Sequence, residues 1–301
     1  MKRTPDLLLT ALAPAVWGST YFVATAWLPE GRPMTLAMLR ALPAGLLLLA
    51  IVRRLPLRER LPQVLVLGTL NFAVFWTLLF VAAQRLPGGV AATLGSAQAL
   101  LVLLFARGLL GTPVRAASVA AAVAGALGVG LLVMGPAATL DPLGLAAGAG
   151  SAAAMAAGTV LSRKWQSGVG PLTFTAWQLT AGGMVLLPMA LLSEGRLPAL
   201  DAVHVGGLVY LGLIGAALTY FLWFRGIARL GPATVSLLAL LSPVTAVGIG
   251  WVALDQRLTA MQCIGVLVVL LSVGVGQWAA SRPEVPFARR IPGARPVTLL
   301  R

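Results

Sequence analysis

The sequence has very little charge for its length. Only 10% of its 301 residues are Asp, Glu, Lys or Arg, whereas 59% are hydrophobic. A soluble domain carries roughly 25% charged residues, so this chain cannot cover a water-soluble surface. The net charge is +14, but the basic residues lie between long apolar runs and not on one polar face. We therefore expect no nucleic-acid partner and predict that the chain is embedded in a lipid bilayer.

Chemically reactive side chains are equally scarce. The single cysteine, Cys263, excludes an intramolecular disulfide framework and a cysteine metal cluster. The single histidine, His204, removes most zinc and histidine-base chemistry. All eight acidic residues lie at the ends of apolar runs, in connections or in the tail, and the sequence contains neither a Walker A nor a His-Glu-x-x-His motif. We expect no enzyme activity, no metal and no other cofactor, and we expect Cys263 to be a small buried residue.

What the sequence has instead is a series of long apolar runs. A run of about 20 apolar residues crosses the roughly 30 Å hydrocarbon core as a helix. Ten such runs occur, at residues 7–28, 34–52, 63–84, 88–107, 115–134, 143–162, 171–192, 203–224, 232–252 and 259–280. The predicted fold is therefore an all-α integral membrane protein with ten transmembrane helices. Residues 281–301 are rich in Pro and Arg and are expected to form a disordered basic tail.

The distribution of Lys and Arg predicts the orientation of these helices, because cytoplasmic connections carry the excess of basic residues. With the N-terminus in the cytoplasm, 17 of the 22 basic residues fall on the cytoplasmic side and Arg40 lies inside a run. The four on the other side are Arg32, Arg85, Arg196 and Arg257. Both termini are therefore predicted to be cytoplasmic, in a bacterial inner membrane.

The chain contains an internal repeat. Residues 71–86 register with residues 215–230 at a shift of 144, and a second match occurs at a shift of 138. The equivalent pairs are Trp76 and Tyr220, Phe80 and Phe224, Arg85 and Arg229, Leu86 and Leu230, then Arg40 and Gln178, and Gly45 and Gly183. We predict two repeats, residues 1–136 and 137–280, with five helices each. Because five is odd, the second repeat enters the membrane from the opposite side, an arrangement that exposes a central site alternately to either side.

Polar and aromatic residues in the middle of the runs mark a candidate site, because a polar group in hydrocarbon is costly without a partner. Trp17 and Tyr21 share one helix face, as do Asn71 and Phe75, and Pro243 frees a backbone carbonyl. We predict an aromatic, uncharged chamber between the repeats, with helix packing as the alternative role for its rings. The predicted lining is Trp17, Tyr21, Asn71, Phe75, Trp76, Ser96, Gln98, Tyr220, Ser242 and Pro243.

Arg40 lies about two turns inside the second run, on the predicted extracellular half. Its long stem allows the guanidinium to reach outward to the membrane surface, which would be a structural role. Alternatively, it attracts a carboxylate at the mouth of the chamber.

Several of these residues resemble a known family. Trp17-Gly18-Ser19, Arg40 and the Arg85-Leu86-Pro87-Gly88-Gly89 segment are similar to the EamA repeat of the drug/metabolite transporter superfamily, as is Leu240-Leu241-Ser242-Pro243. The family usually has Glu where this chain has Asp255. The resemblance implies a ten-helix exporter of amino acids, related metabolites, sugars or cationic drugs with a central cavity. The uncharged aromatic lining most resembles that of the YddG-type exporters, which are associated with aromatic amino acids and methyl viologen.

The resulting hypothesis is an exporter of amino acids, aromatic and other neutral ones favoured, that works by alternating access as a monomer or weak homodimer. The alternatives are an exporter of cationic drugs such as methyl viologen or of other small metabolites, a passive channel, and a membrane-embedded enzyme. The runs contain no carboxylate that could relay protons. We therefore expect a facilitator that moves its substrate down the substrate's own gradient.

Overall fold

The computed structural model describes residues 3–29, 31–86, 94–133, 141–166, 168–195, 199–253 and 259–281. Every regular element in these ranges is a helix. The first half of the chain contains α1 (Arg3–Ala26), α2 (Pro33–Val52), η1 (Arg58–Arg60), α3 (Leu61–Gly68), η2 (Thr69–Val74), α4 (Phe75–Arg85), α6 (Gln98–Leu110) and α7 (Ala116–Val133). The second half contains α8 (Pro142–Trp165), α9 (Pro171–Glu194), α10 (Ala202–Val209), η3 (Tyr210–Leu218), α11 (Thr219–Leu230), α12 (Pro232–Leu238), α13 (Leu241–Ala253) and α14 (Ala260–Ser281).

Proline sets the start of several helices. Pro33, Pro142, Pro171 and Pro232 each occupy the first position of a helix. Proline is favoured there because its fixed φ suits the helix and its missing N–H has no intrahelical partner at that position. At the start of α8, the Asp141 carboxylate also accepts a hydrogen bond from a backbone N–H of the first turn.

Seven helices in the described part of the chain are long and apolar enough to cross a membrane, judged by length and composition. They are Pro33–Val52, Arg58–Ala82, Pro142–Trp165, Pro171–Glu194, Ala202–Leu230, Pro232–Val252 and Ala260–Ala280. Two shorter apolar helices, Leu94–Leu110 and Ala116–Leu132, fall within the fourth and fifth predicted runs or close to them. The chain is thus a multi-pass helical membrane protein, and the count of ten helices stays a prediction.

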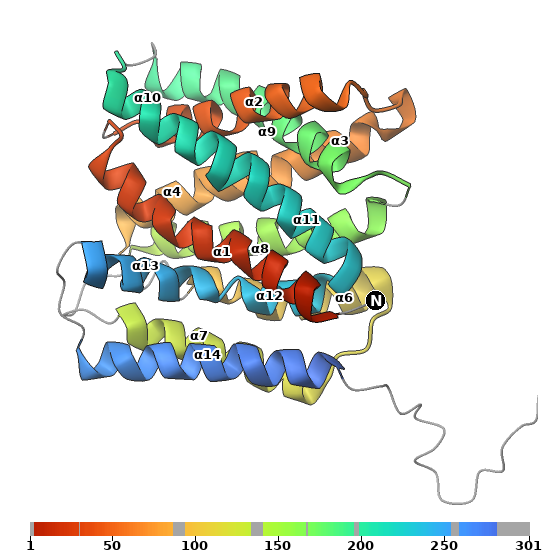
Figure 1. Ribbon diagram of the computed structural model, residues 1–301, viewed down its shortest axis with the longest axis vertical. Coiled ribbons are helices and arrows are strands. Elements are labelled where there is room, and N and C mark those ends of the chain that lie inside the picture. The colour runs from red at the N-terminus through yellow and green to blue at the C-terminus, as the bar shows by residue number, and fades with distance from the viewer. Residues whose placement is uncertain are drawn as a thin grey trace, which may run out of the picture.

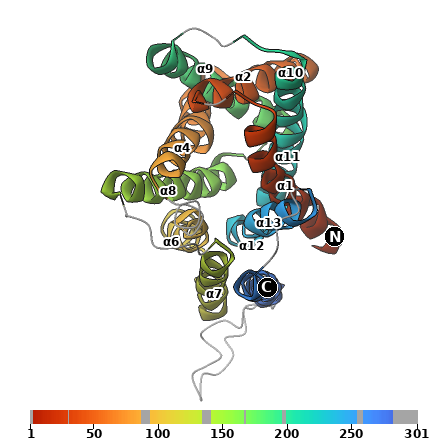
Figure 2. The ribbon, with the colours of Figure 1, turned by 90° about the vertical axis from the view of Figure 1, so that its left-hand side faces the viewer.

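The two halves of the chain pack against each other in equivalent pairs. Helix α2 lies along α9, and α7 lies along α14 at the opposite end of the molecule (Figures 1 and 2). Between them, α4 packs on α8 as α1 packs on α11, and α6 packs on α8 as α1 packs on α13. These contacts match the order of the elements in the two halves, so the second half repeats the arrangement of the first.

The α2–α9 contact is reciprocal at the level of single residues. A Cβ placed on Gly45 would collide with the Thr180 backbone nitrogen, and a Cβ on Gly183 would lie 2.7 Å from the Leu42 Cα. At the shift of 138, Gly45 is equivalent to Gly183 and Leu42 is equivalent to Thr180. Small residues let helix backbones approach closely in lipid, and here each half contributes the same glycine.

Both halves contain a π-helical segment that the sequence analysis did not predict. The six residues of η2 fall, at the shift of 144, on the last six residues of η3. A π segment carries one extra residue per turn and occurs frequently at functional sites. The two segments lie at the centre of Arg58–Ala82 and Ala202–Leu230, the longest helices among the candidate spans.

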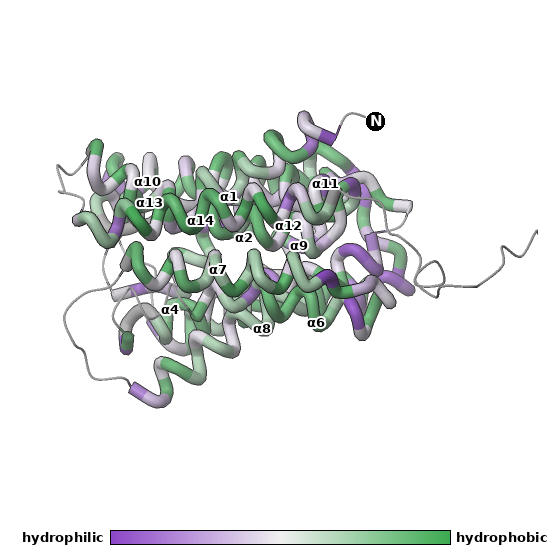
Figure 3. The backbone as a smooth tube through the Cα atoms, turned by 90° about the horizontal axis from the view of Figure 1, so that it is seen from below, coloured by the Kyte–Doolittle hydropathy of each residue, from purple (hydrophilic) through white to green (hydrophobic). Residues whose placement is uncertain are grey.

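Hydrophobic residues run along the lengths of the helices, while hydrophilic residues gather mainly towards the helix ends (Figure 3). Many large apolar side chains point outward, including Leu192 at 89% exposure. Such a surface suits lipid and not water.

Two predictions about rare residues can be compared with the structure. Cys263 is exposed on α14, so the expectation of a buried residue was wrong, because this side of α14 faces outward. His204 accepts a hydrogen bond from the Asp201 N–H, and the Asp201 carboxylate accepts one from the His204 N–H, which forms a capping box at the start of α10. The histidine therefore has a structural role.

Candidate functional site

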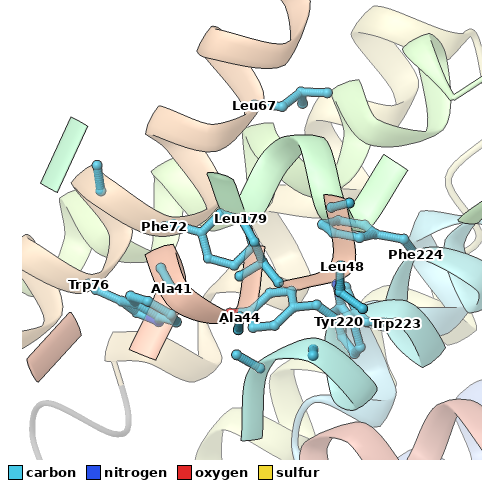
Figure 4. Close-up of a cluster of buried hydrophobic side chains, with 14 of the residues drawn as sticks. Ala41, Ala44, Leu48, Leu67, Phe72, Trp76, Leu179, Tyr220, Trp223 and Phe224 are labelled. Carbon is cyan, nitrogen blue, oxygen red and sulfur yellow. The ribbon is translucent and has the colours of Figure 1, made fainter. Parts of the chain in front are cut away.

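An aromatic cluster lies where the two halves of the chain meet. Its central ring is Tyr220, which is almost completely buried and comes from α11 (Figure 4). Ring centroids lie 4.6 Å from it for Phe72 and 5.0 Å for Trp17. The Phe224 ring lies 5.8 Å away and the Trp76 ring 6.3 Å away. These separations and the tilted ring planes are those that aromatic pairs favour.

Trp17 ties this cluster to the first helix. Its ring centroid lies 4.9 Å from that of Trp223, and its Nε1 donates a 2.9 Å hydrogen bond to the Thr219 hydroxyl. That hydroxyl in turn donates a 2.8 Å hydrogen bond to the Gly215 carbonyl in η3. The indole of one half is therefore held by a polar chain that ends in the π segment of the other half.

Arg40 reaches the same π segment from α2. It is only 9% exposed, donates a hydrogen bond from Nη2 to the Gly215 carbonyl, and places its Cζ 4.9 Å from the centroid of the Trp76 ring. The ion pairs found among the described residues do not include Arg40. The guanidinium points into the protein, so the outward orientation considered from the sequence was wrong. A carbonyl dipole and an aromatic face attract it more than the lipid boundary does.

Asn71 lies in the other π segment and contacts a different set of groups. Its Nδ2 donates a 2.8 Å hydrogen bond to Gln178 Oε1 on α9 and a 3.3 Å hydrogen bond to the Ser162 hydroxyl on α8. A Cβ on Gly158 would collide with Asn71 Oδ1, so the amide rests directly on the α8 backbone. Both Asn71 and Gln178 are almost fully buried.

The two polar contacts at the π segments are equivalent in the repeat. At the shifts of 138 and 144, Arg40 corresponds to Gln178 and Gly215 corresponds to Asn71. Each half thus sends a polar side chain from its second helix to the π segment of the other half. The two contacts have the same place in the repeat but differ in charge. The Asn71–Gln178 contact joins two neutral amides, whereas the Arg40–Gly215 contact contains a full positive charge.

The predicted site residues lie in several parts of the structure. Trp17, Trp76 and Tyr220 meet in the aromatic cluster, and Phe75 packs on the same core. Ser242 and Pro243 lie at the start of α13; a Cβ on Gly18 of α1 would lie 2.6 Å from the Ser242 carbonyl oxygen.

The remaining predicted residues lie elsewhere. Asn71 faces α8 and α9. Ser96 and Gln98 lie near the middle of the fourth predicted run, where α6 begins at Gln98, and Gln98 Nε2 is buried without a hydrogen-bond partner among the described residues. The side chain of Tyr21 lies outside what the structure describes, as does Asp255.

Sequence reasoning did not include Phe72 and Phe224 in the site. Phe72 precedes Trp76 by four residues, and Phe224 follows Tyr220 by four residues, so each pair shares a helix face. This spacing was visible in the sequence and would have extended the aromatic set.

Ion pairs join equivalent helices of the two halves, α1 with α11 and α8 with α4. On the predicted cytoplasmic side, the Asp6 carboxylate lies 2.5 Å from Arg225 and 3.0 Å from Arg229. On the other side, Arg85 lies 3.2 Å from Asp141. Arg85 and Arg229 are equivalent in the repeat, and each pairs with an aspartate at the start of the first helix of the other half.

The two aspartates are both held in the charged form. Partial desolvation raises the pKa of Asp6, but the hydrogen bonds from Arg229 and Arg225 outweigh it and leave this pKa below its ordinary value. The backbone N–H of Gly144 and the Arg85 guanidinium lower the pKa of Asp141. A pocket of about 520 Å³ opens beside Asp6 and is lined by Arg3, Asp6, Ala228, Arg229, Leu230, Thr234 and Ala280.

Comparison with known proteins matches this arrangement to one family. The profile of the EamA-like transporter family matches residues 5–134 and again residues 142–275. The chain belongs to the EamA-like transporter family. The members of this family are transporters, and two EamA repeats cover most of the chain.

Individual EamA relatives extend along nearly the whole sequence. Protein PecM of Dickeya dadantii is 43% identical over 267 residues, which cover 88% of this chain and 90% of PecM. A probable amino-acid metabolite efflux pump of Escherichia coli is 24% identical over 286 residues, covering 88% of this chain and 92% of the pump. A protein of known crystal structure matches with a TM-score of 0.80 at 21% identity, over 93% of this chain and 100% of that chain. At that identity the likeness shows the EamA fold alone.

Proposed function

We propose that this EamA protein exports amino acids, aromatic and other neutral ones favoured, by alternating access. The observation that carries the proposal is the aromatic cluster, to which both halves of the chain contribute and which has a buried cation at its edge. Aromatic rings offer flat apolar surface, and a guanidinium attracts a carboxylate. Together they suit a small zwitterion with an apolar side chain. The name of the Escherichia coli efflux pump supports the same substrate class.

The proposed architecture is ten transmembrane helices in two inverted five-helix repeats, at residues 1–136 and 137–280, with both termini in the cytoplasm of a bacterial cell. The reciprocal α2–α9 contact and the equivalent ion pairs at the two ends support this arrangement. In an inverted repeat, the same contact can close one end of the central site while its counterpart opens the other.

The proposed lining combines rings with a few polar groups. Trp17, Phe75, Trp76 and Tyr220 supply the aromatic surface, together with Tyr21. The amide and hydroxyl groups come from Asn71, Ser96, Gln98 and Ser242, and the freed carbonyl comes from the turn before Pro243. Gln98 Nε2 and Asn71 Oδ1 are buried without a hydrogen-bond partner among the described residues, which makes these two the best-supported polar members of this set.

Helix α8 has a stripe of small residues at four-residue spacing, Gly144, Gly148, Ala152 and Ala156, and its contacts favour a monomer over a homodimer. A Cβ on Gly144 would meet Leu86, and one on Gly148 would meet Leu94. The α8 stripe is therefore already used for contacts within the chain and is not free for a second copy.

The charge at the site weighs against a cationic drug as the main substrate. Aromatic rings alone can hold cations, but the guanidinium of Arg40 lies against the Trp76 ring. It would repel the dication methyl viologen. Transport is proposed over the membrane-enzyme alternative because the members of the EamA-like family, whose profile matches both halves of this chain, are transporters.

The positions of the acidic residues also bear on how transport is coupled to an energy source. The acidic residues lie outside the predicted runs, so a proton relay has no obvious carrier. We propose a facilitator whose steady-state accumulation does not respond to an imposed pH gradient.

The test uses the purified full chain in liposomes and a panel of radiolabelled amino acids. Liposomes preloaded with unlabelled substrate should accumulate the labelled form transiently above its equilibrium level, which a carrier does and a channel does not. Replacing Trp76 with Ala should reduce uptake at least tenfold, whereas Trp251→Ala, at an exposed ring outside the cluster, should not. Absence of uptake for the whole panel, or equal uptake by the two variants, would refute the proposal.

A further inference from the structure

The two equivalent contacts at the π segments differ in one important respect. Asn71 and Gln178 are neutral and are joined by a hydrogen bond, so this contact contains no charge. At the equivalent position, the hydrogen-bond and cation–π partners of the Arg40 guanidinium among the described residues are the Gly215 carbonyl and the face of Trp76. Neither of these groups carries a negative charge, so the cation is attracted but not neutralised.

Arg40 also has a donor that the protein does not use. Its Nε is buried and has no hydrogen-bond partner among the described residues. The described carboxylates that form ion pairs do so with Arg85, Arg225, Arg229 or His204. A buried cation with an empty donor is costly, so this position is stabilised by any anion that reaches it.

We infer that Arg40 binds the carboxylate of the transported substrate, and that the Gly215 carbonyl occupies Nη2 only while the carrier is empty. The inference rests on the proposed function and identifies the substrate group that is recognised. Nε and Nη2 form one edge of the planar guanidinium, which matches the two oxygens of a carboxylate. The apolar part of the substrate would then lie on the aromatic cluster, next to Trp76.

The local structure allows this exchange without leaving an unsatisfied group. When Nη2 turns to the substrate, the Gly215 carbonyl keeps its 2.8 Å hydrogen bond from the Thr219 hydroxyl. Thr219 also accepts the hydrogen bond from Trp17. Substrate binding at Arg40 is thereby connected through two short hydrogen bonds to the indole on the first helix.

The absence of a side chain at Gly215 is part of the same arrangement. A Cβ there would lie 3.4 Å from Arg40 Nη2, in van der Waals contact with the guanidinium and on the side where it meets the Gly215 carbonyl. The equivalent residue, Asn71, has a side-chain amide, which donates hydrogen bonds to Gln178 and Ser162. The site for an acidic group therefore exists in one half only, as expected for a carrier that binds a molecule with a single carboxylate.

The experiment compares substrates with and without the carboxylate in proteoliposomes. The probes are L-phenylalanine, L-phenylalaninamide and phenethylamine, each used to compete with uptake of the amino acid that the wild type transports best. The wild type should be inhibited by L-phenylalanine at concentrations at least tenfold lower than by either analogue. Because hydrogen bonds to charged groups are strong, Arg40→Gln should abolish this preference, so that the three probes inhibit at similar concentrations, and Arg40→Lys should restore part of it.

A control variant separates recognition from packing. Gln178→Leu perturbs the equivalent neutral contact, so it should weaken all three probes by the same factor and leave their ratio unchanged. Equal inhibition of the wild type by acid and amide would overturn the inference while uptake itself still supported the proposed function. The same holds if Arg40→Gln elutes as a monodisperse protein and keeps the wild-type ratio. If Arg40→Gln does not fold, the wild-type probe series and Arg40→Lys still decide the question.

Discussion

The glycine pair between α2 and α9 gives a sharp prediction about stability. A Cβ on Gly45 would collide with the Thr180 nitrogen and lie 2.8 Å from the Leu179 carbonyl carbon. Both are backbone atoms and cannot rotate away, so Gly45→Ala must push the two helices apart. Overpacking of this kind costs about 1–3 kcal/mol.

A matched variant should have the opposite effect. Gly108 lies in α6, and a Cβ placed on it would have no neighbouring atom within 4 Å. Replacing it with Ala adds no clash and gains roughly 0.5–1 kcal/mol, because glycine is the more flexible residue in the unfolded chain. The comparison therefore holds the chemical change constant and varies only the surroundings.

The assay is the apparent Tm of the purified protein in one detergent, followed by size-exclusion chromatography after heating. With about 2–4 °C for each kcal/mol, Gly45→Ala should lower the Tm by about 2–12 °C, and Gly108→Ala should leave it equal or higher. Gly183→Ala should resemble Gly45→Ala, and the double variant should cost less than the sum because one separation relieves both contacts. An unchanged Tm for Gly45→Ala would refute the close approach of these helices.

Three further predictions concern charge, topology and the candidate site. Asp6→Asn should destabilise the protein at pH 7. Because the folded-state pKa of Asp6 is lowered, the difference from the wild type should shrink as the pH falls below the unfolded-state value of about 3.9 and disappear below the folded-state pKa; an equal difference at acid pH would contradict this. In a cysteine-free background, Leu200→Cys should react with an impermeant thiol reagent from outside intact cells and Arg58→Cys should not, and the reverse pattern would overturn the orientation. Asn71→Leu should lower thermal stability because it removes a hydrogen bond between helices, whereas Gln98→Leu should reduce uptake and leave the Tm unchanged or higher; unimpaired uptake by Gln98→Leu would remove this residue from the site.

Much of the fold could be predicted because the membrane imposes a simple length rule on apolar runs. The internal match was equally informative: it placed Trp76 opposite Tyr220 in the repeat, and both rings belong to one cluster. It also aligned Arg85 with Arg229, which form equivalent ion pairs. These features depend on residue type and spacing, which a single sequence contains.

Other features depend on contacts that cannot be predicted from the types of the residues and their spacing in the sequence. The partner of Asn71 is Gln178, 107 residues away, and nothing local to either residue indicates the pair. The sequence left two alternatives open for Arg40, and its partner could not be predicted because it is a backbone carbonyl, a group that is the same at every position of a sequence. The π segments were missed for a related reason, since their residues are ordinary helix residues and only the hydrogen-bond register distinguishes them.

The π segments also determine the directions in which the rings point. Each residue of an α-helix advances the chain by about 100° around the axis, so one inserted residue rotates everything that follows by that angle. Trp76 and Tyr220 both come after a π segment, within a few residues of its end. The direction of each ring therefore depends on the number of residues in the π segment that precedes it. Deleting one residue in Thr69–Val74 or Tyr210–Leu218 would leave an apolar helix that is still long enough to span the membrane. The deletion would nevertheless turn the ring away from its neighbours in the cluster. The number of residues in each π segment is therefore as important for the site as the aromatic residues themselves.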